Sequence, residues 1–130
     1  MTKMVKLLNE DYFTSELVLA NTQLELQILY KKSDHPLRRK LVLEKWTDLS
    51  YALIKKAKTG KEAKKVYEYT PHNFIEPKVR RFVFQYWHTI SLKEIEEAKT
   101  AKEVRQIQKN APEVLQGLAN RKRVLMAKEK

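Results

Sequence analysis

The chain has 130 residues, no cysteine, two glycines, four prolines and a formal net charge of +11 at pH 7. This length suits a single domain with its own core, and the lack of cysteine excludes disulfides and thiolate metal sites. No apolar run approaches the roughly 18 residues that a membrane-spanning helix needs, and Glu10 and Asp11 stand where a secretory signal would have its apolar region. We therefore expect a cytoplasmic protein without a membrane partner.

The positive charge is unevenly distributed along the chain. Residues 1–35 carry a net charge of −1, residues 36–76 carry +5, residues 77–117 carry +3 and residues 118–130 carry +4. Such an asymmetry predicts an acidic partner, although it does not determine a fold.

Residues 1–35 form the first and most degenerate copy of a unit that recurs along the chain. At a spacing of 37 residues, Thr22 aligns with Thr59, but Asn9 stands where a tryptophan is expected. Four further positions also align, namely Val5 with Val42, Tyr12 with Leu49, Leu17 with Ile54 and Ala20 with Ala57. End units of stacked arrays are commonly atypical because one of their faces meets water.

Residues 36–76 and 77–117 are two clear copies of the same unit. The segment PLRRKLVLEKW, which starts at Pro36, recurs as PKVRRFVFQYW from Pro77. The register then holds without a gap, and 12 of the 41 aligned positions are identical. A partial further copy follows at residues 118–130, where Arg121 aligns with Arg80 and Val124 with Val83. These four units predict one helical-repeat domain over residues 1–130.

Each unit is predicted to hold a long helix A followed by a short helix B. Helix A starts at a proline, which is tolerated in the first helical turn, and should run from Pro36 to Ala57 in the second unit. Its apolar positions recur at steps of three to five residues, which is typical of a helix face. Trp46 and Trp87 lie on that face. Burial in the core is therefore favoured for them over stacking on nucleobases.

Helix B begins with a capping box in three units. A threonine precedes a glutamate by three residues, so that each side chain can satisfy a backbone N–H of the first turn. The three pairs are Thr22 with Glu25, Thr59 with Glu62 and Thr100 with Glu103. Because they recur in repeat register, we expect three B helices and about seven helices in all.

The tandem hairpins resemble α-solenoid repeats and lie nearest to the HEAT-like class in length. The resemblance covers nearly the whole chain but is generic, because no signature of one named family is present. It implies an all-α stack of helix hairpins, right-handed or otherwise HEAT-like, that serves as an interaction scaffold.

A ladder of basic pairs is the main candidate for a binding site. The pairs lie 41 residues apart near the start of helix A, where the helix dipole disfavours cations. They are Arg39 with Lys40, Arg80 with Arg81, and Arg121 with Lys122. Equivalent positions of a solenoid align along one edge, and such a row can follow a phosphate backbone. The alternative is that these residues only solvate exposed helix starts.

Other charged and aromatic residues are weaker candidates. Lys55 and Lys56 align with Glu96 and Glu97, and this reversal predicts ion pairs between units rather than a binding site. Lysines on and before the second helix B add to the positive field, namely Lys58, Lys61, Lys64 and Lys65. The aromatic side chains with most freedom to contact a ligand are Tyr67, Tyr69, Phe74 and Tyr86.

No catalytic or metal-binding pattern is recognisable. The histidines are far apart, without a second ligand at metal spacing, and Ser50 and Ser91 have no base beside them. Glu94, Glu96 and Glu97 are expected to be a solvated cluster on a polar helix face. We therefore expect no enzyme, no metal and no cofactor.

The sequence leaves two classes of function open. In the first, a non-enzymatic helical-repeat module binds nucleic-acid phosphates through the basic ladder. In the second, the module is a protein-interaction scaffold that binds an acidic peptide or helix, or self-associates, and the charge mainly steers the encounter.

Overall fold

The computed structural model describes residues 13–70 and 77–128, and every regular element in these segments is a helix. In chain order the elements are α2 (Phe13–Leu19), α3 (Gln23–Lys32), α4 (Pro36–Lys56), α5 (Gly60–Glu68), α6 (Pro77–Glu97), α7 (Ala101–Gln108), the 3₁₀ turn η2 (Glu113–Leu115) and α8 (Gln116–Lys128). None of these described helices is long and apolar enough to cross a membrane. The predicted all-helical fold class is confirmed for the described residues.

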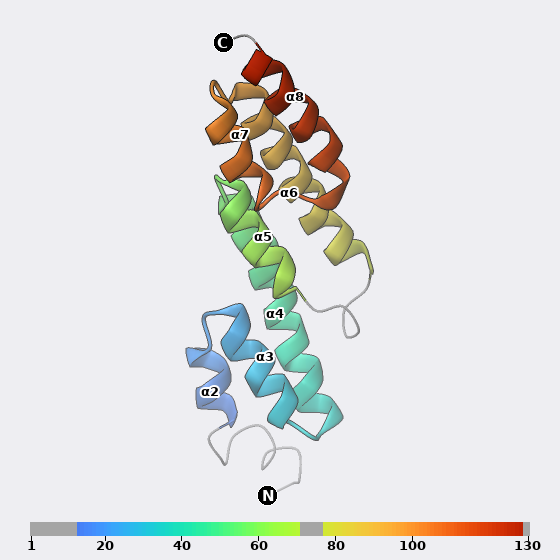
Figure 1. The fold of residues 1–130 in the computed structure, drawn as a ribbon. Coiled ribbons are helices and arrows are strands. Elements are labelled where there is room, and N and C mark those ends of the chain that lie inside the picture. Colours follow the sequence, from blue (N-terminus) through green and yellow to red (C-terminus); the bar gives the residue numbers. More distant parts are fainter. Residues whose placement is uncertain (1–12, 71–76, 129–130) are drawn as a thin grey trace, which may run out of the picture.

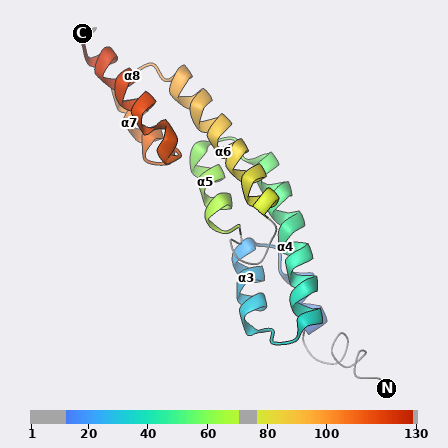
Figure 2. The same cartoon turned by 90° about the vertical axis from the view of Figure 1, so that its right-hand side faces the viewer.

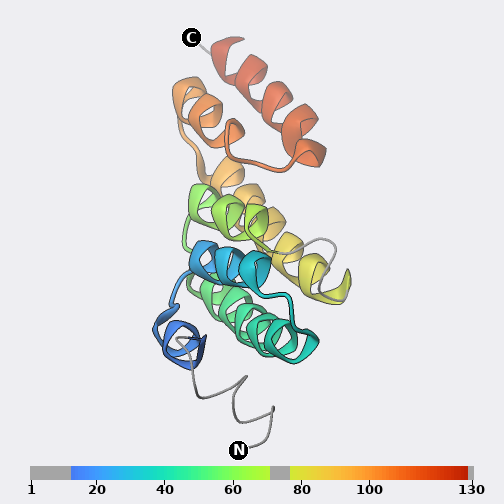
Figure 3. The same cartoon turned by 90° about the horizontal axis from the view of Figure 1, so that it is seen from below.

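From α3 onward, short and long helices alternate and lie on two sides of an elongated molecule. The short helices α3, α5 and α7 lie on one side of α4 and α6 (Figures 1 and 2). Each short helix packs against the long helix that follows it, so α3 contacts α4, α5 contacts α6 and α7 contacts α8. The long helices α4 and α6 also contact each other. Successive elements therefore follow one another from one end of the molecule to the other (Figure 3).

The bounds of the long helices agree closely with those predicted for helix A. The helices α4 and α6 each have 21 residues and start at Pro36 and Pro77, 41 residues apart. The start of α4 is capped by His35, whose Nδ1 atom accepts a hydrogen bond from the backbone N–H of Leu37 at 3.1 Å.

All three predicted caps of helix B are confirmed. In each, the threonine hydroxyl accepts a hydrogen bond from the backbone N–H three residues later. The N–H donors and distances are Glu25 to Thr22 at 3.1 Å, Glu62 to Thr59 at 3.2 Å and Glu103 to Thr100 at 3.1 Å. One such cap typically stabilises a helix by about 1 kcal/mol.

The two tryptophans are core residues, as predicted. The exposed fraction is 1% for Trp46 and 8% for Trp87. The Trp46 indole N–H donates to the carbonyl of Tyr69 at 2.9 Å, and the Trp87 indole N–H donates to the carbonyl of Asn110 at 2.7 Å. Donors and acceptors are both 41 residues apart, so each tryptophan fastens a long helix to the end of the short helix that follows it.

The start of α5 differs from the start of α3 at one equivalent position. In α3, the buried Gln23 side chain donates to the hydroxyl of Ser50 at 2.9 Å. In α5 the corresponding residue is Gly60, whose backbone N–H donates to Oε1 of Glu94 at 2.7 Å. The hydroxyl of Ser91, the counterpart of Ser50, is buried without a hydrogen-bond partner among the described residues.

The predicted register of the C-terminal copy is wrong. Val42 and Val83 are fully buried, but Val124, which the sequence aligns with them, is 48% exposed. Ala119 is fully buried in its place. The cause is that Leu115 of η2 and the residues Ala119 and Met126 of α8 pack into the apolar cluster formed with α6 and α7.

We predict opposite effects for alanine at the two glycines. A Cβ atom on Gly60 would lie 2.6 Å from Oε1 of Glu94 and 2.9 Å from Oγ of Ser91, whereas one on Gly117 would meet nothing within 4 Å. Gly60→Ala should therefore lower the free energy of unfolding by about 1–2 kcal/mol, because crowding outweighs its better helix propensity. Gly117→Ala, the matched control, should raise it by about 0.5–1 kcal/mol.

Urea denaturation followed by circular dichroism measures both free energies. Stabilisation by both substitutions would contradict the close approach of Glu94 and Ser91 to Gly60.

Candidate binding surface

Two arginines of the basic ladder, Arg39 and Arg80, have partners within the fold. The Arg39 guanidinium lies 5.2 Å from the centre of the Tyr30 ring, and its Nε donates to the carbonyl of Ser33 at 2.6 Å. The Arg80 guanidinium lies 4.5 Å from the Tyr67 ring centre, and its Nε donates to the Tyr67 hydroxyl at 3.0 Å. A cation over an aromatic ring at a surface is worth about 0.5–1 kcal/mol. Both arginines therefore connect the start of a long helix to the preceding short helix.

Lys122 also serves the fold. Its ammonium donates to the carbonyl of Glu96 at 2.7 Å and to that of Ile95, and both acceptors belong to the last turn of α6. Lys45 makes the same kind of contact with the end of α2, where it donates to the carbonyls of Val18, at 3.1 Å, and Leu17. A cation at a helix C-terminus satisfies free carbonyls and complements the dipole. Lys122 is thus the counterpart of Lys45.

The other three residues of the ladder are available to a partner. Lys40, Arg81 and Arg121 are exposed, and none of them has a hydrogen bond or an ion pair with the described residues. The ladder therefore separates into three cations that support the fold and three that face solvent.

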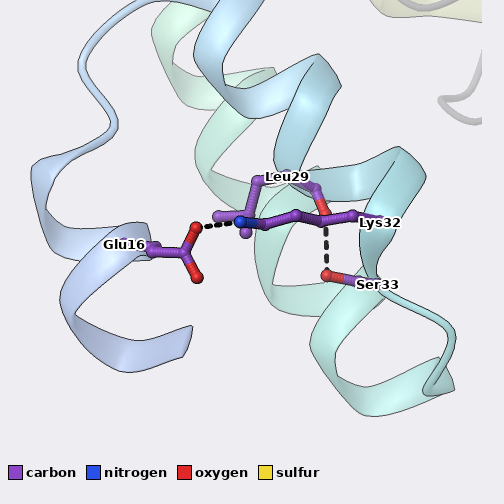
Figure 4. A network of polar contacts seen from close by, with 4 residues as sticks. All are labelled: Glu16, Leu29, Lys32 and Ser33. Atoms are coloured by element: carbon purple, nitrogen blue, oxygen red, sulfur yellow. Dashed lines mark hydrogen bonds and ion pairs between the residues drawn. The ribbon is translucent and has the colours of Figure 1, made fainter. Parts of the chain in front are cut away.

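Ion pairs neutralise little of the positive charge. Within the segments that the structure describes there is one, between Lys32 of α3 and Glu16 of α2 (Figure 4). Beside it, the Ser33 hydroxyl donates to the carbonyl of Leu29 at 2.7 Å and closes the end of α3 (Figure 4).

The predicted pairing of Lys55 and Lys56 with Glu96 and Glu97 is wrong, because α4 and α6 are shifted along each other. The end of α4 lies beside the start of α6, as the Lys55 ammonium shows by its position 5.9 Å from the ring centre of Phe82. Glu96 lies roughly 20 Å further along α6. Equivalent helix ends are therefore too far apart to pair.

A second group of cations lies on the short helices α5 and α7. The ammonium of Lys64 on α5 donates to the carbonyl of Lys109 at the end of α7 at 3.3 Å, so the two helices approach each other there. The exposed cations of this surface are Lys61, Lys102, Arg105 and Lys109, whereas the exposed Lys65 lines a groove on the side of α5 that faces α3. No large apolar side chain of α5 or α7 is exposed. We call this set the α5–α7 surface.

The first pair of the ladder borders a groove with mixed charges. The groove has a volume of about 930 Å³ and runs along α4 to the start of α6. Arg39 and Lys40 line it together with three carboxylates, namely those of Asp34, Glu44 and Asp48. These acids reduce the attraction of this groove for a polyanion.

The aromatic candidates are mostly engaged in packing. Tyr67 is half-buried, with its ring centre 5.0 Å from that of Trp87, and Tyr69 is half-buried as well. Tyr86 is 36% exposed and lies 4.9 Å from Phe82 between ring centres. Phe74 lies outside the described residues. Tyr86 is thus the most accessible of those described.

Several of the residues weighed for chemistry have structural partners, although the buried Ser91 hydroxyl has none among the described residues. The Ser50 hydroxyl donates to the carbonyl of Trp46 at 2.8 Å, and Glu94 caps α5 instead of belonging to a solvated acidic cluster. His35 caps α4, and His72 lies outside the described residues. Within the described part of the chain, no three histidine, aspartate or glutamate side chains gather as metal ligands.

Comparisons of the chain with protein-family models, with curated proteins and with solved structures find no match. Its function has to be inferred from its side chains and their surroundings.

Lys45 and Lys122, which cap the ends of α2 and α6, give a prediction that distinguishes cations that support the fold from cations that are free to bind a partner. Lys45→Met and Lys122→Met should each lower the free energy of unfolding by about 1 kcal/mol, because carbonyls at a helix end lose a charged donor. Lys40→Met, the matched control without a partner, should change it by less than about 0.5 kcal/mol. Thermal unfolding followed by circular dichroism tests this. Equal effects of all three substitutions would contradict the assignment.

Proposed function

We propose that the chain is a non-enzymatic α-solenoid of HEAT-like hairpins, built as one domain, whose basic surface binds the phosphate backbone of a nucleic acid. Equivalent tryptophan and arginine contacts at repeat spacing support the solenoid arrangement. The basic surface supports the choice of an acidic partner.

The observation that carries the proposal is the excess of exposed cations without an acidic partner. The net charge is +11, yet a single ion pair joins two residues within the described segments. Concentrated positive charge costs free energy through self-repulsion, and a bound polyanion relieves that cost. Phosphate contacts of lysine and arginine dominate the affinity of nucleic-acid binding.

Two sets of residues are the proposed contacts. The first is the set of three exposed cations Lys40, Arg81 and Arg121, which replaces the six-residue ladder because the other three members are engaged in the fold. The second is the α5–α7 surface. Since this surface has no exposed large apolar side chain, it suits phosphates better than a protein partner, whose interface needs an apolar centre. Such contacts position a backbone without reading its sequence.

We expect the wild-type protein to bind random-sequence single- or double-stranded oligonucleotides with micromolar or tighter affinity that falls steeply with salt. The triple variant Lys40→Glu/Arg81→Glu/Arg121→Glu should bind at least about tenfold more weakly near physiological salt. The slope of log K against log salt should become shallower by about two. Fluorescence anisotropy at several salt concentrations measures both quantities.

The matched control is Lys31→Glu/Lys93→Glu/Lys128→Glu, which changes the net charge equally at exposed lysines that belong to neither proposed set. Circular dichroism establishes that both variants are folded. No binding by the wild type at low salt would exclude the nucleic-acid function. An equal loss in both variants would mean that net charge alone, and not these residues, is responsible.

Exposed apolar side chains favour self-association as a second candidate function. They lie at the two ends of the described structure, on α2 and α3 and on the η2–α8 segment (Figure 1). The most exposed are Val18, Leu19, Ile28, Val114 and Leu125. Because exposed apolar patches mark interaction surfaces, we expect Leu125→Glu to lower any concentration-dependent rise in mass measured by light scattering. A mass that stays monomeric at all concentrations would exclude this function.

A further inference from the structure

An apolar groove with basic edges lies between α3 and α5, at the end of α4. Its volume is about 570 Å³, within the range of ligand-binding clefts. Apolar side chains from all three helices line it, namely Leu24, Leu53, Val66 and Tyr69, together with the exposed Lys56 and Lys65. Leu24 is 48% exposed, so an apolar side chain of a partner can reach it.

The equivalent junction between α5 and α7 has a different character. In repeat register, Leu24 is replaced by Lys61 and Leu53 by Glu94, whose carboxylate accepts the hydrogen bond from the N–H of Gly60 at 2.7 Å. The two lysines are replaced as well, Lys56 by Glu97 and Lys65 by Gln106. An apolar floor with basic edges is therefore specific to the α3–α5 junction.

The electrostatics of the groove favour an acidic occupant. Glu62 is the one acidic residue among those that line it. Its backbone N–H and its carboxylate are both engaged with the Thr59 hydroxyl, at 3.2 and 3.4 Å. Lys56 and Lys65 have neither a hydrogen bond nor an ion pair with the described residues. The positive charge of the edges is thus not neutralised from within the described fold.

We propose that this groove binds a short acidic protein segment that places aliphatic side chains on Leu24, Leu53 and Val66 and carboxylates beside Lys56 and Lys65. An apolar centre with a charged rim is the usual composition of a protein–peptide interface, and amphipathic segments bind such grooves through side chains three or four residues apart. The floor is mainly aliphatic, whereas single-stranded nucleic acids stack their bases on aromatic rings. This site is separate from the proposed phosphate contacts and does not depend on them.

The residues of the α5–α7 junction suggest the variant that tests this proposal. Leu24→Lys/Lys56→Glu/Lys65→Gln installs in the groove the residues that the α5–α7 junction has at these positions. All three side chains are exposed, so the fold should be retained, and circular dichroism checks this. Lys61→Glu gives the same net charge outside the groove and is the matched control.

The measurement is a selection of peptides from a displayed random library on the wild-type protein, followed by fluorescence anisotropy with the enriched peptides. We expect enriched sequences that combine acidic residues with aliphatic residues three or four positions apart. Their affinity should fall at least tenfold in the triple variant and by less than about threefold in Lys61→Glu, since surface charges away from a site act weakly.

Failure to enrich any peptide, enrichment of peptides without acidic residues, or equal affinity for the wild type and the folded triple variant would overturn the proposal. Displacement of a bound peptide from the groove by an oligonucleotide would also overturn it in favour of a nucleic-acid occupant. Because the peptides are selected without nucleic acid, a negative oligonucleotide experiment leaves this result interpretable.

Discussion

The hydrogen bond from each buried tryptophan to the end of the following short helix is the contact on which the rest of the structure depends. An indole can be buried in a helical core only if its N–H finds an acceptor, and the carbonyls of Tyr69 and Asn110 provide it. These bonds fix where α5 and α7 end relative to α4 and α6. The aromatic contacts of Tyr67 and the position of Arg80 follow from that placement.

Much of the fold could be predicted from the sequence because it depends on local chemistry. Threonine caps, prolines at helix starts and the periodic apolar face act within one or two turns, so Thr59, Pro36 and Trp46 have the predicted roles. The register of α8 could not be predicted, because residue similarity favoured Val124 whereas packing against α6 and α7 selects Ala119. The stagger of α4 against α6, which separates Lys55 from Glu96, is likewise a property of packing.

The candidate site was predicted only in part, since a cation in a sequence gives no sign of its partner. Arg39 and Arg81 look alike as members of a basic row, yet one lies over Tyr30 and the other faces solvent. One signal could have separated them, because Tyr30 and Tyr67 are repeat-equivalent aromatics that precede Arg39 and Arg80. Lys45 gave no such signal, because its acceptors are backbone carbonyls, which every residue has.

The replacement of Gln23 by Gly60 at the start of a short helix has a consequence for how this chain can be lengthened. A tandem duplicate of residues 36–76 would place a second Leu53, not Glu94, against the glycine of the preceding copy. The N–H of Gly60 would lose the carboxylate that it now contacts, and an apolar side chain would face it. The two central units are therefore not interchangeable modules. The residues at each junction fit only the unit that follows, so the contacts between units determine the order in which the units can occur.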